Sequence, residues 1–274
     1  MAGTLYLVPT PIGNLGDISR RCAETLETVD LIAAEDTRVT LKLLSHLGIK
    51  KPLVSYYRHN TDEAGGKLLE RLQAGENVAL CTDAGTPAVS DPGEDLVVLC
   101  AQHEVPVVAL PGPCALITAL SVSGLPTARF TFEGFLPMNK KNRRSQLEEL
   151  KAEGRTMIFY EAPHKLKNTL DDLLETFGPG RRVSLCRELT KLHEEVIRTT
   201  LAGAAELYGE KEPRGEYVLV VEGARPVKEE ATLEDGLARV GELMEDGLSR
   251  KDAVKQAAKE LGLSRNELYA AAVG

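Results

Sequence analysis

Short apolar runs recur along the chain and alternate with segments whose apolar residues are three or four positions apart. Runs of this length that are rich in Val, Ile, Leu or Tyr are typical of buried strands, and the wider spacing is typical of amphipathic helices. Strands that alternate with helices predict an α/β architecture. The predicted strands are residues 5–8, 31–34, 53–56, 78–81, 105–110, 157–160, 183–186 and 217–221.

The same pattern divides the chain into three predicted domains. An α/β domain over 1–115 precedes a second over 116–225, and a small helical domain over 232–274 follows a linker at 224–231. The tail resembles a helix-turn-helix, with a turn at Gly262 and Ser264 as a helix cap. We leave open whether these helices contact RNA or only pack and dimerise.

Four loops follow predicted strands of the first domain, and three of them contain Gly or Pro. They are residues 9–14, 34–38, 82–87 and 111–114. Ligands bind beyond the carboxyl ends of strands in open α/β sheets, so the four loops predict a small-molecule pocket, although ordinary turns have similar compositions. Close by, Asp91-Pro92-Gly93-Glu94 predicts a helix start with Asp91 as the cap.

Composition narrows the function. The 274 residues carry a net charge of −8, which counts against a generic nucleic-acid binder but leaves room for a local basic patch. No apolar run approaches the roughly 20 residues that span a bilayer, and no signal peptide is evident. Five scattered cysteines without a C-x-x-C pair predict neither disulfides nor a metal site. We therefore expect a cytoplasmic protein.

Several motifs together resemble one superfamily over nearly the whole chain. They are PTPIGNL, DAGTPAVSDPG, LPGPCA, FEGFLP, IFYEAPHKL, LCRELTKLHEEV and GEYVLVVEG. The chain is similar to the tetrapyrrole (corrin/porphyrin) methylases, and among them to the enzymes that methylate ribosomal RNA. The resemblance implies a homodimer of two α/β domains with S-adenosylmethionine (SAM) in the interdomain cleft. It also implies methyl transfer to the ribose 2′-OH of a cytidine in the decoding centre of 16S rRNA.

The resemblance also implies a set of SAM-contacting residues. They are Pro11, Ile12, Asp83, Gly85, Thr86, Val89, Pro113, Cys114, Ala115, Tyr160, Cys186 and Tyr217. Relatives that methylate tetrapyrroles carry Gly-Asp-Pro where this chain has Gly85-Thr86-Pro87. Whether a carboxylate still reaches SAM is therefore open, and Asp83 is the candidate.

Methyl transfer to a ribose hydroxyl requires in-line positioning and help with a poorly acidic proton. The candidate bases or alkoxide stabilisers are Asp36, Glu161 and Glu188. The candidate cations for phosphate or alkoxide are Arg38, Arg187 and Lys191. The alternative for each is an ordinary helix-start cluster or a solvated ion pair, and a structural role is more common for a lone histidine such as His164.

A basic cluster at 139–144 could hold RNA phosphates, although such a run is often only a solvated face. Two rival functions remain open from sequence. One is a methyltransferase acting on a tetrapyrrole or another small molecule. The other is a non-catalytic RNA-binding or ribosome-assembly module with a vestigial pocket.

Overall fold

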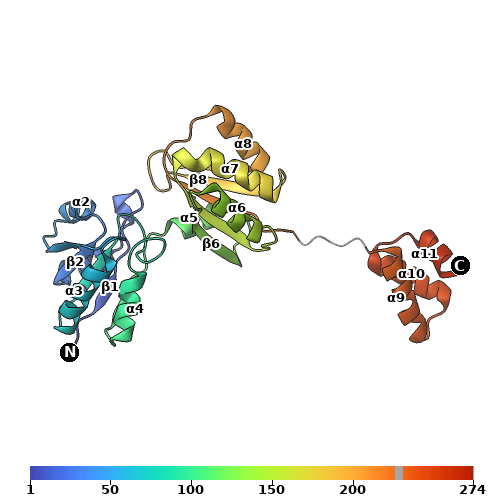
Figure 1. Ribbon diagram of the computed structural model, residues 1–274, viewed down its shortest axis with the longest axis horizontal. Helices are drawn as coiled ribbons and strands as arrows, with labels where there is room; N and C mark the ends of the chain where they lie inside the picture. Colours follow the sequence, from blue (N-terminus) through green and yellow to red (C-terminus); the bar gives the residue numbers. More distant parts are fainter. Residues whose placement is uncertain (226–230, 274) are drawn as a thin grey trace. The chain divides into compact units, whose positions relative to one another are not determined.

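The computed structural model describes residues 1–225 and 231–273 (Figure 1). They belong to two compact units, residues 1–224 and residues 225–274, which we describe one at a time. Most of the predicted linker, residues 226–230, lies outside the described residues. The domain boundaries given above therefore stay predictions.

The first half of the α/β unit is built on an all-parallel sheet with the strand order β3-β2-β4-β1-β5. Its strands are β1 (Leu5–Leu7), β2 (Leu31–Ala34), β3 (Leu53–Ser55), β4 (Val78–Cys81) and β5 (Val107–Ala109). Alternate strand residues enter two separate cores, so both faces are covered by helices. The helices are α1 (Arg20–Thr28), α2 (Thr37–Leu47), α3 (Thr61–Gln73) and α4 (Glu94–Gln102), with a short 3-10 turn η1 (Leu15–Asp17).

The second half is built on a mixed sheet with the order β6-β7-β10-β8-β9. Only β6 and β7 run parallel, and each later pair is antiparallel. The strands are β6 (Phe130–Phe135), β7 (Thr156–Glu161), β8 (Arg182–Arg187), β9 (Glu195–Thr200) and β10 (Tyr217–Val221). Helices α6 (Lys140–Glu149), α7 (Pro163–Phe177) and α8 (Leu201–Glu210) share one core with this sheet, and α5 (Ala115–Val122) packs on its other face.

The α/β prediction is confirmed, and every predicted strand is present, most with bounds that shift by a residue or two. Two strands, β6 and β9, were not predicted. Both lie at the edges of the second sheet, where none of their residues is fully buried. Edge strands need no continuous apolar run, so the hydrophobic pattern that identified the other strands is weak here.

The C-terminal unit contains three helices, as its apolar stripes predicted. They are α9 (Leu233–Glu245), α10 (Arg250–Leu261) and α11 (Arg265–Val273), and they share a small core. Helix α9 begins with a capping box formed by Thr232 and Asp235, and α10 ends at Gly262 in the left-handed conformation. In the described parts of both units, no helix is both long and apolar enough to span a membrane.

Candidate functional site

A cavity of about 470 Å³ lies where the carboxyl-end loops of the first sheet meet the second sheet. Nine of the twelve predicted cofactor residues line it, namely Ile12, Gly85, Thr86, Val89, Cys114, Ala115, Tyr160, Cys186 and Tyr217. They come from both halves of the α/β unit, so neither half forms the cavity alone. The structure thus brings most of this set together, and their part in binding stays a prediction.

Pro11, Asp83 and Pro113 do not line the cavity. Pro113 supports it from behind, because the Thr86 hydroxyl donates a hydrogen bond to the Pro113 carbonyl at 2.9 Å. Gly85 and Thr10 exchange backbone hydrogen bonds of 2.9 and 3.0 Å, which tie the third loop to the first. These bonds hold three of the predicted loops in one wall.

The loop after β4 is unusual in its backbone. Ala88 and Ser90 both have φ of +66°, a region that side chains other than glycine rarely adopt, and Gly93 has φ of +139°. Such residues store strain and cluster at functional sites. A Cβ on Gly93 would lie 2.7 Å from the side chain of Leu80, so glycine is required there on two grounds.

This backbone overturns one prediction. Helix α4 starts at Glu94 with Gly93 at its N-cap, so Asp91 is not the cap. The prediction was wrong because the left-handed residues delay the helix by a few positions. Asp91 instead lines the cavity, half-buried, with no hydrogen bond or ion pair to another described residue. Burial and the nearby carboxylates Glu35 and Asp83 raise the pKa of Asp91 to about 6.

Asp36 and Arg38 form a separate group outside the cavity. Asp36 caps α2 by accepting from the Arg38 backbone at 2.8 Å, and its carboxylate pairs with the Arg38 side chain at 2.6 Å. The hydrogen bonds from Arg38 lower the pKa of Asp36 to about 2. The Asp83 carboxylate accepts from the Asp36 backbone at 3.1 Å. These contacts match the alternative of a helix-start cluster.

Lys191 is the ammonium group that lines the cavity. Its Nζ lies 2.8 Å from both Glu188 and Glu216, and Glu216 lines the cavity beside it. Burial alone would lower the pKa of Lys191, but the hydrogen bonds to Glu188 and Glu216 outweigh it and raise the pKa. The residue is therefore a fixed cation at neutral pH.

A strained turn positions Lys191. Glu188 and Thr190 have φ of +51° and +66°. The turn packs against the first loop so closely that a Cβ on Gly13 would lie 2.4 Å from Cγ of Lys191. Of the other predicted catalytic residues on this strand end, Glu188 supports Lys191 from outside the cavity. Arg187 is paired with Glu195 at 3.1 Å.

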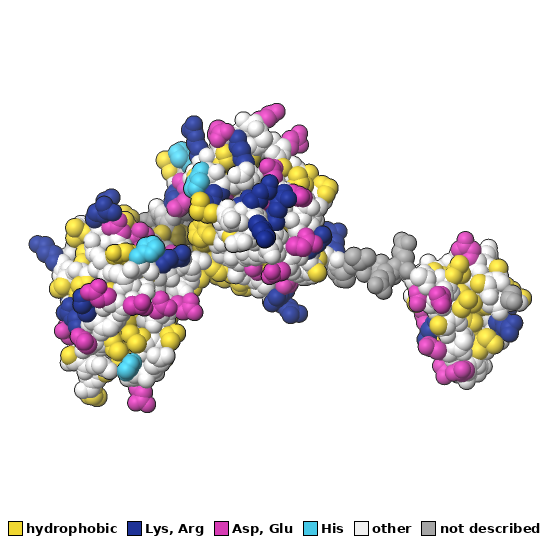
Figure 2. Space-filling model, viewed as in Figure 1, with side chains coloured by type: hydrophobic (Ala, Val, Ile, Leu, Met, Phe, Trp, Pro, Cys, Tyr) yellow, Lys and Arg dark blue, Asp and Glu magenta, His cyan; other side chains and the backbone are white. Residues whose placement is uncertain are grey.

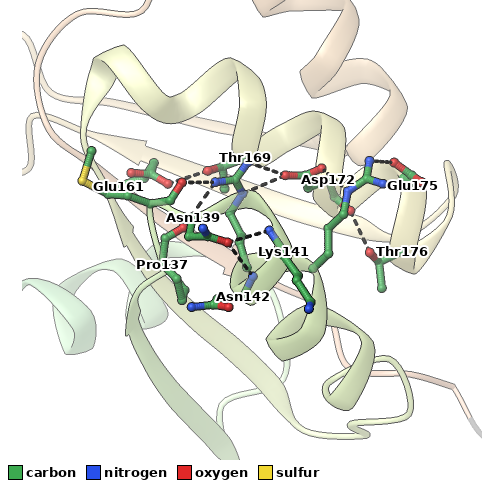
Figure 3. Close-up of polar contacts among 12 residues, drawn as sticks. Pro137, Asn139, Lys141, Asn142, Glu161, Thr169, Asp172, Glu175 and Thr176 are labelled. Carbon is green, nitrogen blue, oxygen red and sulfur yellow. Dashed lines mark hydrogen bonds and ion pairs between the residues drawn. The ribbon is translucent and has the colours of Figure 1, made fainter.

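Glu161 and Tyr160 line the cavity from the end of β7, but both have structural partners. The Glu161 carboxylate is buried and accepts from the Ala162 backbone at 2.9 Å and from the Thr169 hydroxyl at 2.5 Å (Figure 3). The Tyr160 hydroxyl accepts from the backbone of Leu116 at the start of α5, at 3.1 Å. Both groups therefore take part in hydrogen bonds that hold the fold together.

Asp91, Phe135 and Glu216 are among the lining residues that sequence reasoning missed. Glu216 directly precedes β10, whose first residue Tyr217 pairs with Glu161 on one side and Arg187 on the other. The carboxyl ends of β7 and β8 and the amino end of β10 therefore share one edge of the mixed sheet. A search for site residues only at the carboxyl ends of strands overlooks Glu216. His164, which sequence left as a weak candidate, also lines the cavity and is exposed.

Residues 4–205 match the tetrapyrrole (corrin/porphyrin) methylases, and residues 230–274 match the RsmI C-terminal HTH domain. The chain belongs to the tetrapyrrole methylase family. Within that family it is 50% identical to ribosomal RNA small subunit methyltransferase I of Synechocystis sp. over 268 residues, covering 97% of this chain and 96% of that protein. It is 47% identical to the protein of the same name from Escherichia coli O157:H7, with 97% and 93% covered.

Solved structures agree on the fold. The methyltransferase CobJ superposes with a TM-score of 0.61 at 19% identity, over 82% of this chain and 97% of that one. Uroporphyrin-III C-methyl transferase from Thermus thermophilus, complexed with S-adenyl homocysteine, superposes with a TM-score of 0.58 at 20% identity, over 80% and 97%. Both likenesses concern the α/β architecture of this tetrapyrrole methylase.

The basic cluster of this methylase begins four residues after Phe135, the last residue of β6, which lines the cavity wall. Lys and Arg side chains gather over α6 in the space-filling view (Figure 2). Lys140 and Lys141 are exposed and have no ion pair to a described residue, whereas Arg143 and Arg144 are paired with Asp172. Among residues 1–225 and 231–273, no group of three His, Cys, Asp or Glu side chains could hold a metal ion.

Proposed function

We propose that this protein is a SAM-dependent methyltransferase acting on small-subunit ribosomal RNA, and that the acceptor is the ribose 2′-OH of a cytidine in the decoding centre. The observation that carries the proposal is the 44–50% identity, over nearly the full length, to relatives named ribosomal RNA small subunit methyltransferase I. We assign the binding of SAM to the cavity described above.

The cavity suits SAM in size and chemistry. Its volume of about 470 Å³ falls within the range of roughly 300–1,000 Å³ typical of small-molecule sites, and apolar side chains dominate its walls. Gly85 lets the loop backbone come close to a ligand. Bound there, SAM supplies an electrophilic methyl group on a positively charged sulfonium.

Asp91 is the carboxylate that we assign to SAM, in place of Asp83. Its half-buried, unpaired side chain faces the cavity, and a carboxylate complements either the cationic groups or the ribose hydroxyls of SAM. Asp83 instead receives the Asp36 backbone outside the cavity. The missing Gly-Asp-Pro carboxylate is thus replaced from a later position of the same loop.

We infer that Lys191 acts on the acceptor. A pre-positioned ammonium stabilises the negative charge that develops on the 2′-oxygen as its proton passes to solvent water and its bond to the methyl group forms, which lowers the barrier without a strong base. Glu188 and Glu216 hold that ammonium in place. Of the six catalytic candidates, Lys191 keeps a role close to the one predicted. Glu188 positions that ammonium instead of acting on the acceptor, and Glu161 orients its loop.

RNA phosphates are expected to contact the exposed Lys140 and Lys141. RNA is also expected to contact the C-terminal helices of residues 232–274. We further propose that the enzyme works as a homodimer in the cytoplasm, where ribosomal subunits are assembled. These assignments rest on the resemblance and on the charge distribution.

The test is a transfer assay with methyl-labelled SAM. The acceptors are small ribosomal subunits that lack their decoding-centre methylation, naked 16S rRNA and a tetrapyrrole mixture. We expect label in the RNA, recovered after hydrolysis as 2′-O-methylcytidine. Label in the tetrapyrroles alone would keep the cofactor and overturn the RNA substrate. Failure to bind SAM, together with no transfer to any acceptor, would favour the non-catalytic RNA-binding module.

A further inference from the structure

The basic cluster 139–144 contains two kinds of cation. Lys140 and Lys141 are exposed, but only 12% of the Arg143 side chain is accessible, and its partner Asp172 on α7 is 4% accessible. Buried charges are costly unless they are paired and hydrogen-bonded, so Arg143 is built into the fold rather than held out to solvent.

Every nitrogen of the Arg143 guanidinium has a partner. Its Nε donates to Asp172 at 2.7 Å and its Nη2 lies 2.6 Å from the same carboxylate. Its Nη1 donates to the carbonyls of Pro137 and Met138, each at 3.2 Å. Arg144 binds the second oxygen of Asp172 at 3.0 Å and also pairs with Glu175.

These contacts connect two cavity walls. Pro137 and Met138 belong to the segment between Phe135, which lines the cavity, and α6. Asp172 lies one helical turn beyond Thr169, whose hydroxyl holds the Glu161 carboxylate at the other wall. The Arg143–Asp172 pair therefore ties the segment that follows β6 to α7, the helix that follows β7.

We propose that Arg143 is a positioning residue for the acceptor: it fixes segment 136–139, and with it Phe135 and the two exposed lysines, without touching RNA. This inference rests on the proposed function for its acceptor. A planar guanidinium reaches the carboxylate and both carbonyls at once, which the single ammonium of a lysine does not.

The first test separates positioning from phosphate contact. Arg143→Lys keeps a charge opposite Asp172, so the folded enzyme is retained. We expect its kcat at saturating ribosomal subunits to fall roughly tenfold, because small misplacements of reacting groups are expensive. The dependence of RNA affinity on salt should stay unchanged. Lys140→Gln with Lys141→Gln should instead reduce that salt slope by about 1.5, as two lost phosphate contacts require.

Lys151→Gln is the matched control, since Lys151 is an exposed lysine just beyond the far end of α6. It should leave both kcat and the salt slope at wild-type values. A reduced salt slope in Arg143→Lys with normal kcat would overturn the proposal, because Arg143 would then contact phosphate. Normal kcat and a normal slope would overturn it as well.

The second test needs no acceptor. The chain has no tryptophan, and the Met138 side chain is exposed, so Met138→Trp adds a single fluorescent reporter to the segment. With Arg143 intact, we expect high anisotropy and limited acrylamide quenching. Adding Arg143→Lys should lower the anisotropy and increase the quenching. Identical fluorescence would contradict positioning by Arg143, even if the proposed RNA substrate is correct. If Arg143→Lys makes the Met138→Trp reporter mobile but the wild-type enzyme methylates no RNA, the positioning role of Arg143 would stand and the proposed function would be wrong.

Discussion

The two halves of the α/β unit contribute to the cavity in different ways. In the first half every strand is parallel, so all the carboxyl-end loops gather at one edge, and they supply backbone, apolar walls and the carboxylate of Asp91. In the second half the strands are mixed, and the cavity receives side chains from strand ends and from a strand start, including the ammonium of Lys191.

The two halves also differ in the charged groups that they contribute. The first half places Asp91 at the cavity with Glu35 and Asp83 close to it. The second half places Lys191 there, held by Glu188 and Glu216, and carries the exposed Lys140 and Lys141 on α6. A cationic methyl donor is complementary to the first arrangement, and a developing oxyanion and RNA phosphates are complementary to the second. The comparison predicts that variants in the two halves fail in different ways.

The largest effect is expected for Lys191→Met. It removes the ammonium that stabilises the acceptor oxygen, so kcat should fall about 100-fold, the scale found when one oxyanion-stabilising donor is lost. The affinity for S-adenosylhomocysteine should stay close to wild type. Single-turnover transfer and calorimetry measure the two quantities. Lys211→Met, which removes a half-exposed lysine on the same half, is the control. If Lys191→Met lost affinity for S-adenosylhomocysteine and kept its kcat, the assignment of donor and acceptor to different halves would be contradicted.

Asp91→Asn should show the opposite failure. The affinity for S-adenosylhomocysteine should fall about 10- to 100-fold, because a charge-assisted hydrogen bond is typically worth about 1.5–3 kcal/mol. For the wild type, affinity should decline as the pH falls through about 6, where Asp91 takes up a proton. In Asp91→Asn this decline should be absent. Asp95→Asn, an exposed acid on α4, should bind normally.

The same carboxylate has a cost in stability. The folded-state pKa of Asp91 lies above its ordinary value, so its contribution to stability is full at low pH and is lost as the pH rises through about 6. Because Asp91 is only half-buried, solvent screening reduces the effect to about 1 kcal/mol. Ligand-free Asp91→Asn should therefore melt at or above the wild-type temperature at pH 7.5. A lower melting temperature would show that the carboxylate supports the fold.

Gly13→Ala tests the contact between the halves, with a smaller effect. The added methyl group would meet the Lys191 side chain, the Thr190 hydroxyl and the Leu189 carbonyl within about 3 Å. Displacement of the ammonium should reduce kcat roughly tenfold. Gly66→Ala, on α3 with open space around it, should keep full activity and gain slight stability. Equal kcat values for the two variants would show that the turn 188–190 does not need Gly13.

The smallest effect is expected for Asp36→Ala and Arg38→Ala. The two side chains satisfy each other at the start of α2, outside the cavity. Turnover should therefore remain near the wild-type value in the transfer assay. Loss of the cap should lower the melting temperature of Asp36→Ala slightly. A large loss of kcat in either variant would return this pair to the catalytic residues.

The sequence predicted the first half better than the second, for physical reasons. Parallel strands buried on both faces read as continuous apolar runs, and their loops all follow carboxyl ends. The edge strands β6 and β9 lack that signal, and Glu216 precedes a strand. The sequence did not reveal the residues with positive φ in either half. Ala88 and Thr190 carry no sequence mark of a positive φ, yet such residues turn Asp91 and Lys191 toward the cavity.

The most direct test of the division is hydrogen exchange of the intact enzyme, with S-adenosylhomocysteine and then with the small ribosomal subunit. We expect the cofactor product to protect the amides of residues 84–93 and 114–116 first. Addition of the subunit should then protect residues 138–144 and 188–191. Protection of both sets by the cofactor product alone, or of the first set by the subunit alone, would contradict the assignment of donor and acceptor to separate halves.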